Sequence, residues 1–310
     1  MNSKLIFGLL LTGITISCRY DHVQRQYLTK QVIILVIDGA RYTETWGDPT
    51  HQYIPNMAAL AAEGSVFTNF NNNGITNTVN GHSALMTGYY DSLDNGGAEF
   101  PQYPSLMQYY REKYETGQNS CWIISSKDKL EVLGNCTDAS YKNQFQPATN
   151  CGNSGLGTGY RTDTITFLTA LDVLSSDHPS MAMINLKQPD SAAHAGSWAG
   201  YLQGIVDGDN YAAALWDYLQ SDPFYAGTTA LFITNDHGRH LDGWSSGFAS
   251  HGDNCEGCEH IFLMALGPDF KQNFVETDFY DQTDVTATIA NIFGLKMPNA
   301  AGDPIDSILK

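Results

Sequence analysis

The sequence predicts an α/β fold: a three-layer α/β/α sandwich with a mostly parallel central sheet. Short apolar runs with the length of buried strands alternate with segments of helical periodicity, which is the pattern of repeated βαβ units. Such units form a parallel sheet whose two faces are both covered by helices. The chain has 310 residues, 42% of them hydrophobic, and no linker-like stretch divides it. We therefore expect one large core and a single domain.

Five apolar runs are expected to form the central strands. In chain order they lie at 32–37, 121–125, 181–186, 230–234 and 261–266. The helical patterns between them lie at 56–64, 104–114, 161–176 and 209–221. Two polar segments, 134–159 and 239–259, are expected to be cap-like insertions in a domain that spans residues 26–310.

The N-terminal segment is typical of an export signal. Residues 1–17 contain one lysine and an apolar run too short to span a bilayer, and they end in small residues before Cys18. A plain signal peptide and a bacterial lipoprotein signal with a lipidated Cys18 both remain open. Each predicts an exported protein, either periplasmic or attached to the outer membrane. Removing residues 1–17 takes away only the charge of Lys4, so the formal net charge changes from -17 to -18. This acidic balance argues against a nucleic-acid groove, which needs clustered Lys and Arg.

Cysteine usage is consistent with export, because disulfides form in oxidising compartments. If Cys18 is lipidated, the other five cysteines remain, an odd number that leaves at least one thiol unpaired. The expected pairs are Cys136 with Cys151 and Cys255 with Cys258, while Cys121 is expected to be buried at the head of a strand. The alternative for "CEGC" is a zinc knuckle, but the sequence has no second C-x-x-C or paired histidine motif to complete four ligands.

Polar side chains follow several of the predicted strands. Each of them alone has an ordinary explanation as a turn residue, a helix cap or a surface histidine. Together, three aspartates and three histidines at one sheet edge predict two metal sites with oxygen and imidazole donors, which suit zinc. Two ions about 4 Å apart can clamp the attacking and leaving oxygens of a phosphoryl group. The set is Asp38, Asp190, His194, Asp236, His237 and His251.

A nucleophile is offered by the polar stretch 71–88, which contains Thr76 and Thr78 and leads into an apolar helical pattern. A hydroxyl at a helix N-terminus lies near a partial positive charge and free backbone N–H groups. These features favour an alkoxide and an anionic substrate. The alternative is that Thr78 only caps the helix.

The ordered motifs "VIDGAR", "TNTVNGHSALMTG", "PDSAAH", "TNDHG" and "SHG" resemble the alkaline phosphatase superfamily. Within it, the chain looks closest to type I nucleotide pyrophosphatase/phosphodiesterases and threonine-dependent bacterial alkaline phosphatases. The resemblance implies an alkaline phosphatase-like fold, two Zn²⁺ ions and Thr78 as the nucleophile of a phosphothreonine mechanism. It assigns the metal ligands to two sets. One set is Asp38, Asp236, His237 and the Thr78 oxygen, and the other is Asp190, His194 and His251.

One departure from the relatives is "TVNGH", where they often have T-x-P-N-H. Two further likenesses concern the substrate. The S-x-K-D-K segment resembles an S-x-K-D-R segment of the threonine-dependent phosphatases, which implies that Lys127 and Lys129 contact the transferred phosphate. The alternative is that both are solvated lysines in a turn. Asn95 is similarly implied to bind a phosphate oxygen, although its spacing is shorter.

These observations predict a hydrolase of small phosphate esters. Added cations favour a monoester over a diester, because a monoester carries an extra negative charge. A phosphodiesterase or nucleotide pyrophosphatase is the alternative, and a non-enzymatic metal- or glycan-binding lipoprotein is a third. A sulfatase needs a cysteine or serine in a C/S-x-P-x-R setting, which the sequence around Thr78 lacks. A phosphoglycerate mutase of the same superfamily needs a further domain, for which the chain length leaves little room.

Overall fold

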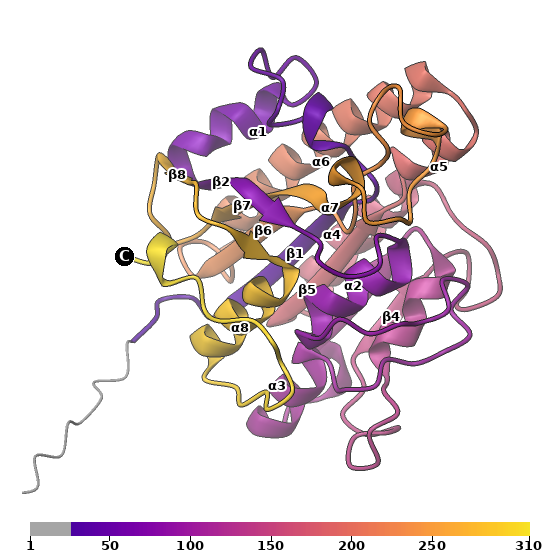
Figure 1. Cartoon of the computed structure of the whole chain (residues 1–310). Helices are drawn as coiled ribbons and strands as arrows, with labels where there is room; N and C mark the ends of the chain where they lie inside the picture. Colours follow the sequence, from indigo (N-terminus) through magenta and orange to yellow (C-terminus); the bar gives the residue numbers. More distant parts are fainter. Residues whose placement is uncertain (1–25) are drawn as a thin grey trace, which may run out of the picture.

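The computed structural model describes residues 26–310 and contains a single nine-stranded sheet (Figure 1). Its spatial order is β4-β3-β5-β1-β6-β7-β2-β8, with β9 also paired to β2. The strands are β1 (Gln31–Ile37), β2 (Gly64–Asn71), β3 (Cys121–Ser125), β4 (Ala148–Cys151), β5 (Met181–Leu186), β6 (Thr229–Thr234), β7 (His260–Leu266), β8 (Phe274–Glu276) and β9 (Tyr280–Asp281). The expected export signal and Cys18 lie outside the described residues.

Parallel pairing dominates the sheet. The neighbours β4, β3, β5, β1 and β6 are all parallel, whereas β7 runs antiparallel to both β6 and β2. Successive residues of β1 point to opposite faces. Val32, Ile34 and Val36 enter one apolar core, and Ile33, Leu35 and Ile37 enter the other. Both faces of the sheet are therefore buried.

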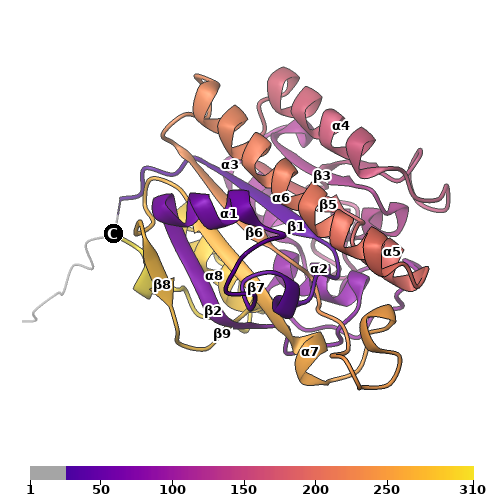
Figure 2. The same ribbon diagram turned by 90° about the horizontal axis from the view of Figure 1, so that it is seen from above.

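Helices cover the two faces. The first core includes side chains of α2, α3 and α8, and the second includes side chains of α1, α4 and α6. Figure 2 shows α1, α4 and α6 lying together along one face of the sheet. The helices are α1 (Pro55–Leu60), α2 (Thr78–Thr87), α3 (Leu106–Tyr114), α4 (Asp163–Ser176), α5 (Asp190–His194), α6 (Trp198–Ser221), α7 (Glu256–Glu259) and α8 (Gln282–Phe293). This arrangement confirms the predicted three-layer α/β/α sandwich. Within residues 26–310, no helix combines the length and hydropathy that a bilayer crossing requires.

All five expected strands are present, but β2, β4 and the short strands β8 and β9 were not predicted. β2 has a mixed sequence, GSVFTNFN, and its first residue was included in a helical pattern. β4 is a four-residue edge strand inside the segment 134–159. Helix α6 begins at Trp198, earlier than the sequence pattern predicted. The pattern missed its first turns because Gly204 and Gly208 interrupt the apolar periodicity there. A Cβ at these positions would lie 2.8 Å from the Pro189 Cα and 2.9 Å from the Ile37 Cγ2, so the helix packs closely there.

The expected disulfides are not formed among the described residues. Cys121, Cys136, Cys151, Cys255 and Cys258 are all free thiols. Cys151 lies in β4 with its Sγ 3.7 Å from the carbonyl oxygen of Ile123, so it packs against the neighbouring strand β3. Cys121 is buried at the start of β3, as predicted.

Candidate active site

Four parallel strands deliver the predicted side chains to one edge of the sheet. Asp38 follows β1 directly, Lys127 follows β3, Asp190 begins α5 after β5, and Asp236 follows β6. These strands are neighbours in the order β3-β5-β1-β6, and their carboxyl ends open into the same crevice. The four residues are at most 3% exposed. Asp190 does not cap a helix, because α5 has no side-chain cap hydrogen bond.

Thr78 is the first residue of α2, and its hydroxyl faces this crevice. The N-cap of the helix is Asn77, whose side chain accepts a hydrogen bond from the Asn80 backbone N–H. Thr78 is therefore not the cap, and its Oγ1 accepts a hydrogen bond of 2.9 Å from Lys127 Nζ. The other candidate, Thr76, donates its hydroxyl to the carbonyl of Asp253 at 2.7 Å. Of the two threonines, only Thr78 has its hydroxyl among the predicted ligands.

The departure "TVNGH" has a structural reason at Gly81. A Cβ there would lie 2.3 Å from the carbonyl oxygen of Asp236, so α2 can pack against the end of β6 only if this position lacks a side chain. The glycine thus brings the start of α2 close to the loop that carries two of the predicted ligands.

His82 belongs to the site, although it was not among the predicted residues. Its Nδ1–H donates to the carbonyl of Thr78 at 2.8 Å and lies 3.3 Å from Asp236 Oδ2. Its Nε2 lies 3.1 Å from the amide Nδ2 of Asn185, which also donates to Asp38 Oδ2 at 2.9 Å. Asn185 therefore orients Asp38, and His82 lies between Asn185 and Asp236. The signal in the sequence was a histidine four residues after Thr78, on the same face of the helix.

The residues of the first implied ligand set lie near one another, although two groups of donors within 4.8 Å of one another join Asp38 with His82 and Asp236, and Asp190 with His237 and His251. His237 Nε2 lies 3.4 Å from Asp236 Oδ2 and 3.7 Å from Asp38 Oδ1. His237 Nε2 and Asp236 Oδ2 are buried and have no hydrogen-bond partner among the described residues. His237 Nδ1–H donates to the Gly238 carbonyl, so the lone pair of Nε2 points into the site. Burial lowers the pKa of His237 well below its usual value, which keeps the ring neutral. Unpaired buried polar atoms are unfavourable, and a divalent cation fits between them.

The second ligand set is also assembled. The Asp190 Oδ1 lies 3.2 Å from His194 Nε2 and 3.4 Å from His251 Nε2, and the two Nε2 atoms are 2.9 Å apart. Donor atoms around a tetrahedral zinc ion, with bonds of about 2.0–2.1 Å, are separated by roughly 3.3 Å. His251 Nδ1–H donates to the Thr76 carbonyl, and burial lowers the pKa of His251 to about 4. The three donors therefore also fit a small divalent cation.

The two sets adjoin each other. The His237 and His251 rings stack with centroids 3.8 Å apart. Lys127 lies between the sets, where its ammonium donates to Asp38 Oδ1 at 2.8 Å, Asp190 Oδ2 at 2.7 Å and Thr78 Oγ1 at 2.9 Å. Burial alone would lower the pKa of Lys127, but Asp190 and Asp38 outweigh it and raise the pKa above the usual value. Lys127 is a buried, charged group and not a solvated lysine.

Arg239 is a second site residue that was not predicted, although it directly follows the "TNDHG" motif. It is fully buried and its guanidinium bonds to Asp190 Oδ1 and to the carbonyl of Phe248. Burial alone would raise the pKa of Asp190, but Lys127 and further cationic neighbours hold it well below its usual range. Arg239 thus joins a ligand aspartate to the segment that carries His251.

Lys129 and Asn95 lie beside the start of α2. Lys129 Nζ donates to Asn95 Oδ1 at 3.0 Å, and the same oxygen accepts from the Val79 backbone N–H at 3.0 Å. Lys129 is 8% exposed, so it is not a solvated turn lysine either. Burial, followed by the charge of Lys127, lowers the pKa of Lys129 to about 8. Lys129 and Asn95, two of the three predicted phosphate-binding residues, therefore lie beside Val79, which follows Thr78.

Comparisons with known proteins agree with a hydrolase of the alkaline phosphatase superfamily. Residues 30–295 match the sequence model of the sulfatase family, so the chain belongs to that family, which is part of the superfamily. The resemblance inferred from the motifs is thereby confirmed. No curated protein matches the chain.

Solved structures share the fold at low sequence identity. Murine ectonucleotide pyrophosphatase/phosphodiesterase 5, in an inactive form with AMP, is 14% identical with a TM-score of 0.66, covering 91% of this chain and 100% of that chain. BT4656 in complex with its substrate D-glucosamine-2-N,6-O-disulfate is 12% identical with a TM-score of 0.69, covering 91% and 80%. The phosphonate monoester hydrolase of Agrobacterium radiobacter is 13% identical with a TM-score of 0.59, covering 89% and 78%. These likenesses concern the fold alone.

Proposed function

We propose that the protein is an exported, metal-dependent phosphoric ester hydrolase that uses Thr78 as its nucleophile and favours phosphate monoesters. One observation carries the proposal. The buried Thr78 hydroxyl lies 2.9 Å from the Lys127 ammonium, between two sets of metal-type ligands, while another residue caps its helix. A hydroxyl in this position is free to react and lies beside a cation that stabilises its ionised form.

The metal assignment follows the donor sets. Asp38, Asp236, His237 and the Thr78 oxygen would hold one Zn²⁺ ion, and Asp190, His194 and His251 the other. When bound, zinc acts as a Lewis acid that lowers the pKa of coordinated hydroxyl groups and water and neutralises charge on phosphoryl oxygens.

Charge balance supports a need for metal. The site has three negative charges, on Asp38, Asp190 and Asp236. Two cations, Lys127 and Arg239, are in contact with these aspartates. Without divalent ions this excess of negative charge would repel an anionic ester.

The chemical step is a double displacement at Thr78. Its oxygen forms a bond to phosphorus as the bond to the leaving oxygen breaks, which gives phosphothreonine, and the proton lost from the Thr78 hydroxyl ends on the leaving oxygen, which departs as an alcohol. Water then attacks the same phosphorus as the bond from phosphorus to the Thr78 oxygen breaks, and one water proton returns to that oxygen, which regenerates the hydroxyl and releases phosphate. Lys127 is not the base, because its raised pKa keeps it protonated. Its role is to orient the hydroxyl and stabilise the alkoxide.

Substrate preference is assigned to the cations beside Thr78. The Lys127 ammonium donates its three hydrogen bonds to Asp38, Asp190 and Thr78. When the aspartates hold metal ions, the ammonium can turn donors toward the phosphate. Lys129 and the amide of Asn95 lie next to it and complete a cationic, polar surface suited to a dianionic monoester.

A phosphodiesterase is the second candidate, favoured by the fold shared with a phosphodiesterase solved with AMP. A sulfatase is the third, favoured by the family itself. The threonine at position 78 argues against the third, because formylglycine is made from cysteine or serine.

The test is a panel of three esters with the same 4-nitrophenol leaving group: a phosphate monoester, a methyl phosphate diester and a sulfate. We expect zinc-loaded wild type to prefer the monoester. Lys127→Ala should lower kcat/KM for both phosphate esters, because Lys127 also stabilises the Thr78 alkoxide, and should lower it for the monoester by a further factor of about 10–150, from roughly 1.5–3 kcal/mol per charge-assisted contact.

The matched control is Lys30→Ala, because Lys30 is exposed and precedes β1 at the end opposite Asp38. Preference for the diester or the sulfate would replace the monoesterase assignment. Bound zinc without turnover of any ester would favour the non-enzymatic alternative.

A further inference from the structure

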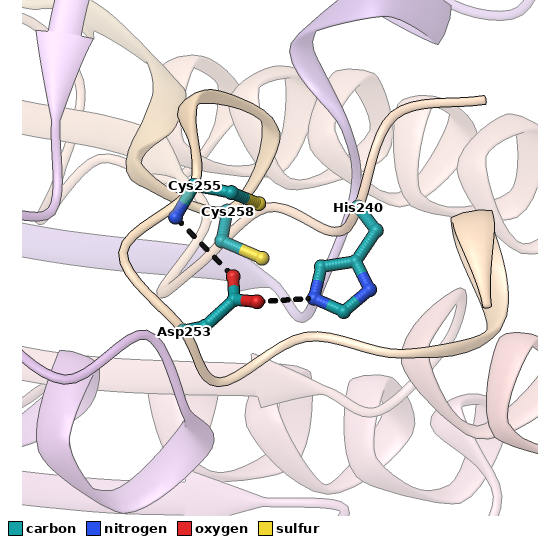
Figure 3. Close-up of side chains that lie close together, drawn as sticks. All are labelled: His240, Asp253, Cys255 and Cys258. Carbon is teal, nitrogen blue, oxygen red and sulfur yellow. Dashed lines mark hydrogen bonds and ion pairs between the residues drawn. The ribbon is translucent and has the colours of Figure 1, made fainter. Parts of the chain in front are cut away.

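We infer a second kind of metal site in this protein, a structural zinc site formed by His240, Asp253, Cys255 and Cys258. One donor atom from each residue lies within 4.8 Å of the others. Figure 3 shows the Cys258 sulfur, the Asp253 carboxylate and the His240 ring turned toward one another, with Cys255 beside them. The inference does not depend on the proposed ester hydrolysis, because none of these residues belongs to the catalytic ligand sets.

The backbone explains how the four residues meet. The Gly238 and Arg239 N–H groups donate to the carbonyls of Cys258 and Gly257, each at 2.8 Å, which fixes the C-x-x-C turn beside the end of β6. The Cys258 N–H donates to the Cys255 carbonyl at 2.9 Å and closes that turn. His240 follows directly, so its ring faces the turn.

His240 is the residue that points to a ligand. It is 5% exposed, and neither of its ring nitrogens has a hydrogen bond among the residues that the structure describes. Its Nε2 lies 3.0 Å from Asp253 Oδ2, close enough for both atoms to share one cation. A buried imidazole that has a carboxylate beside it but no hydrogen bond is unfavourable, and a metal ion bound by both groups would satisfy them.

The donor set favours zinc over a disulfide. Two thiolates, one imidazole and one carboxylate make a closed tetrahedral set of the kind found in structural zinc sites. A Cys255–Cys258 disulfide would consume both sulfurs and leave the His240 ring nitrogens without a hydrogen bond. Burial raises the pKa of the Cys255 and Cys258 thiols, so zinc must displace their protons as it binds.

Zinc at this position would hold the segment 239–259 against the catalytic loop. The segment is long and has little regular structure, only the short turn Gly247–Ala249 before α7. The Asp253 carbonyl accepts from the Thr76 hydroxyl at 2.7 Å, and the nearby His251 bonds to the Thr76 carbonyl at 2.8 Å. A metal crosslink that closes such a loop restricts it and thereby positions His251. Asp253 and Cys255 also line a cavity of about 450 Å³, which gives an ion a route to the site.

The experiment uses the full chain, purified without chelator or reductant, with its zinc replaced by cobalt(II). Only this cluster contains sulfur among the three groups of metal-type donors in the described residues. A near-ultraviolet thiolate-to-cobalt absorption band therefore reports this site and no other. We expect the band in wild type. Cys258→Ser should lose the band, and elemental analysis should find one zinc equivalent per chain fewer than in wild type.

Two controls keep the result specific. His194→Ala changes a catalytic ligand that has no sulfur, and Cys121→Ser removes a buried thiol outside the cluster, so both should retain the band. Asp253→Asn, checked for folding by circular dichroism, should weaken zinc binding without removing a cysteine. A wild type without the band, a band that needs prior reduction, or a Cys255–Cys258 disulfide in the unreduced peptide map would each overturn the inference.

Discussion

The catalytic ligands and the His240, Asp253, Cys255 and Cys258 cluster differ in how the backbone carries them. Three catalytic aspartates lie at the ends of β1, β5 and β6, which are adjacent and hydrogen-bonded along their length. The cluster instead lies in a segment with little regular structure between β6 and β7. The sheet positions its ligands through strand pairing, whereas the loop has fewer such constraints and would be held further by the proposed zinc ion.

The donor atoms of the catalytic sets and of the cluster also differ. The proposed catalytic sets combine oxygen and imidazole donors, and the second of them has three protein donors, Asp190, His194 and His251. The cluster has four protein donors, two of them sulfur, and leaves no position for substrate. A metal site with a coordination position left free suits catalysis, and a site with four protein ligands suits a structural role.

The largest effect should come from Thr78→Ala. We expect it to reduce kcat by about a thousandfold or more, because it removes the nucleophile, while metal content and fold are retained. Thr76→Ala is the matched control and should keep most of the activity, since its hydroxyl bonds to the Asp253 carbonyl. An active Thr78→Ala together with an inactive Thr76→Ala would show that the other threonine reacts.

The sequence predicted the ligands that follow the strands of the sheet. It missed much of the cluster in the loop between β6 and β7. Asp38, Asp190 and Asp236 could be placed at one edge because each follows an apolar run whose direction a parallel sheet fixes. His240 and Asp253 could not be joined to Cys255 and Cys258, because their approach depends on hydrogen bonds between Gly238, Arg239 and the C-x-x-C turn. Local pattern carries no signal for such contacts.

The same distinction explains the other omissions. β2 and β4 are short or polar strands whose place is set by their neighbours in the sheet and not by their own periodicity. His82 stands within a recognised motif and Arg239 directly follows one, but their roles depend on the tertiary contacts with Asp236 and Asp190.

His251→Ala should separate the two kinds of site. It removes a catalytic donor, so catalytic metal occupancy and kcat should fall together, the rate by more than about a hundredfold. The thiolate-to-cobalt band of the cluster should persist, because no cluster ligand changes. Full metal occupancy by elemental analysis would contradict the ligand assignment, and loss of the band would mean that the two sites do not form independently.

A smaller effect should appear in the pH dependence. Because the pKa of Lys129 is lowered to about 8, its positive charge is present below that pH and is lost as the pH rises through it. We therefore expect kcat/KM for the monoester to lose about tenfold above this pH, through loss of one charge-assisted contact. Lys129→Arg should keep the charge and move this decline to higher pH. Identical profiles for the monoester and the diester in both proteins would remove Lys129 from substrate recognition.

The central claim is that ester cleavage proceeds through phosphothreonine at Thr78, and the stereochemical course at phosphorus tests it most directly. An aryl phosphate made chiral with three oxygen isotopes would be used as donor, with transfer to an alcohol acceptor by zinc-loaded wild type. Two successive in-line displacements each invert the phosphorus centre, so we predict overall retention of configuration. Overall inversion would mean a single direct displacement, and it would contradict the role assigned to Thr78.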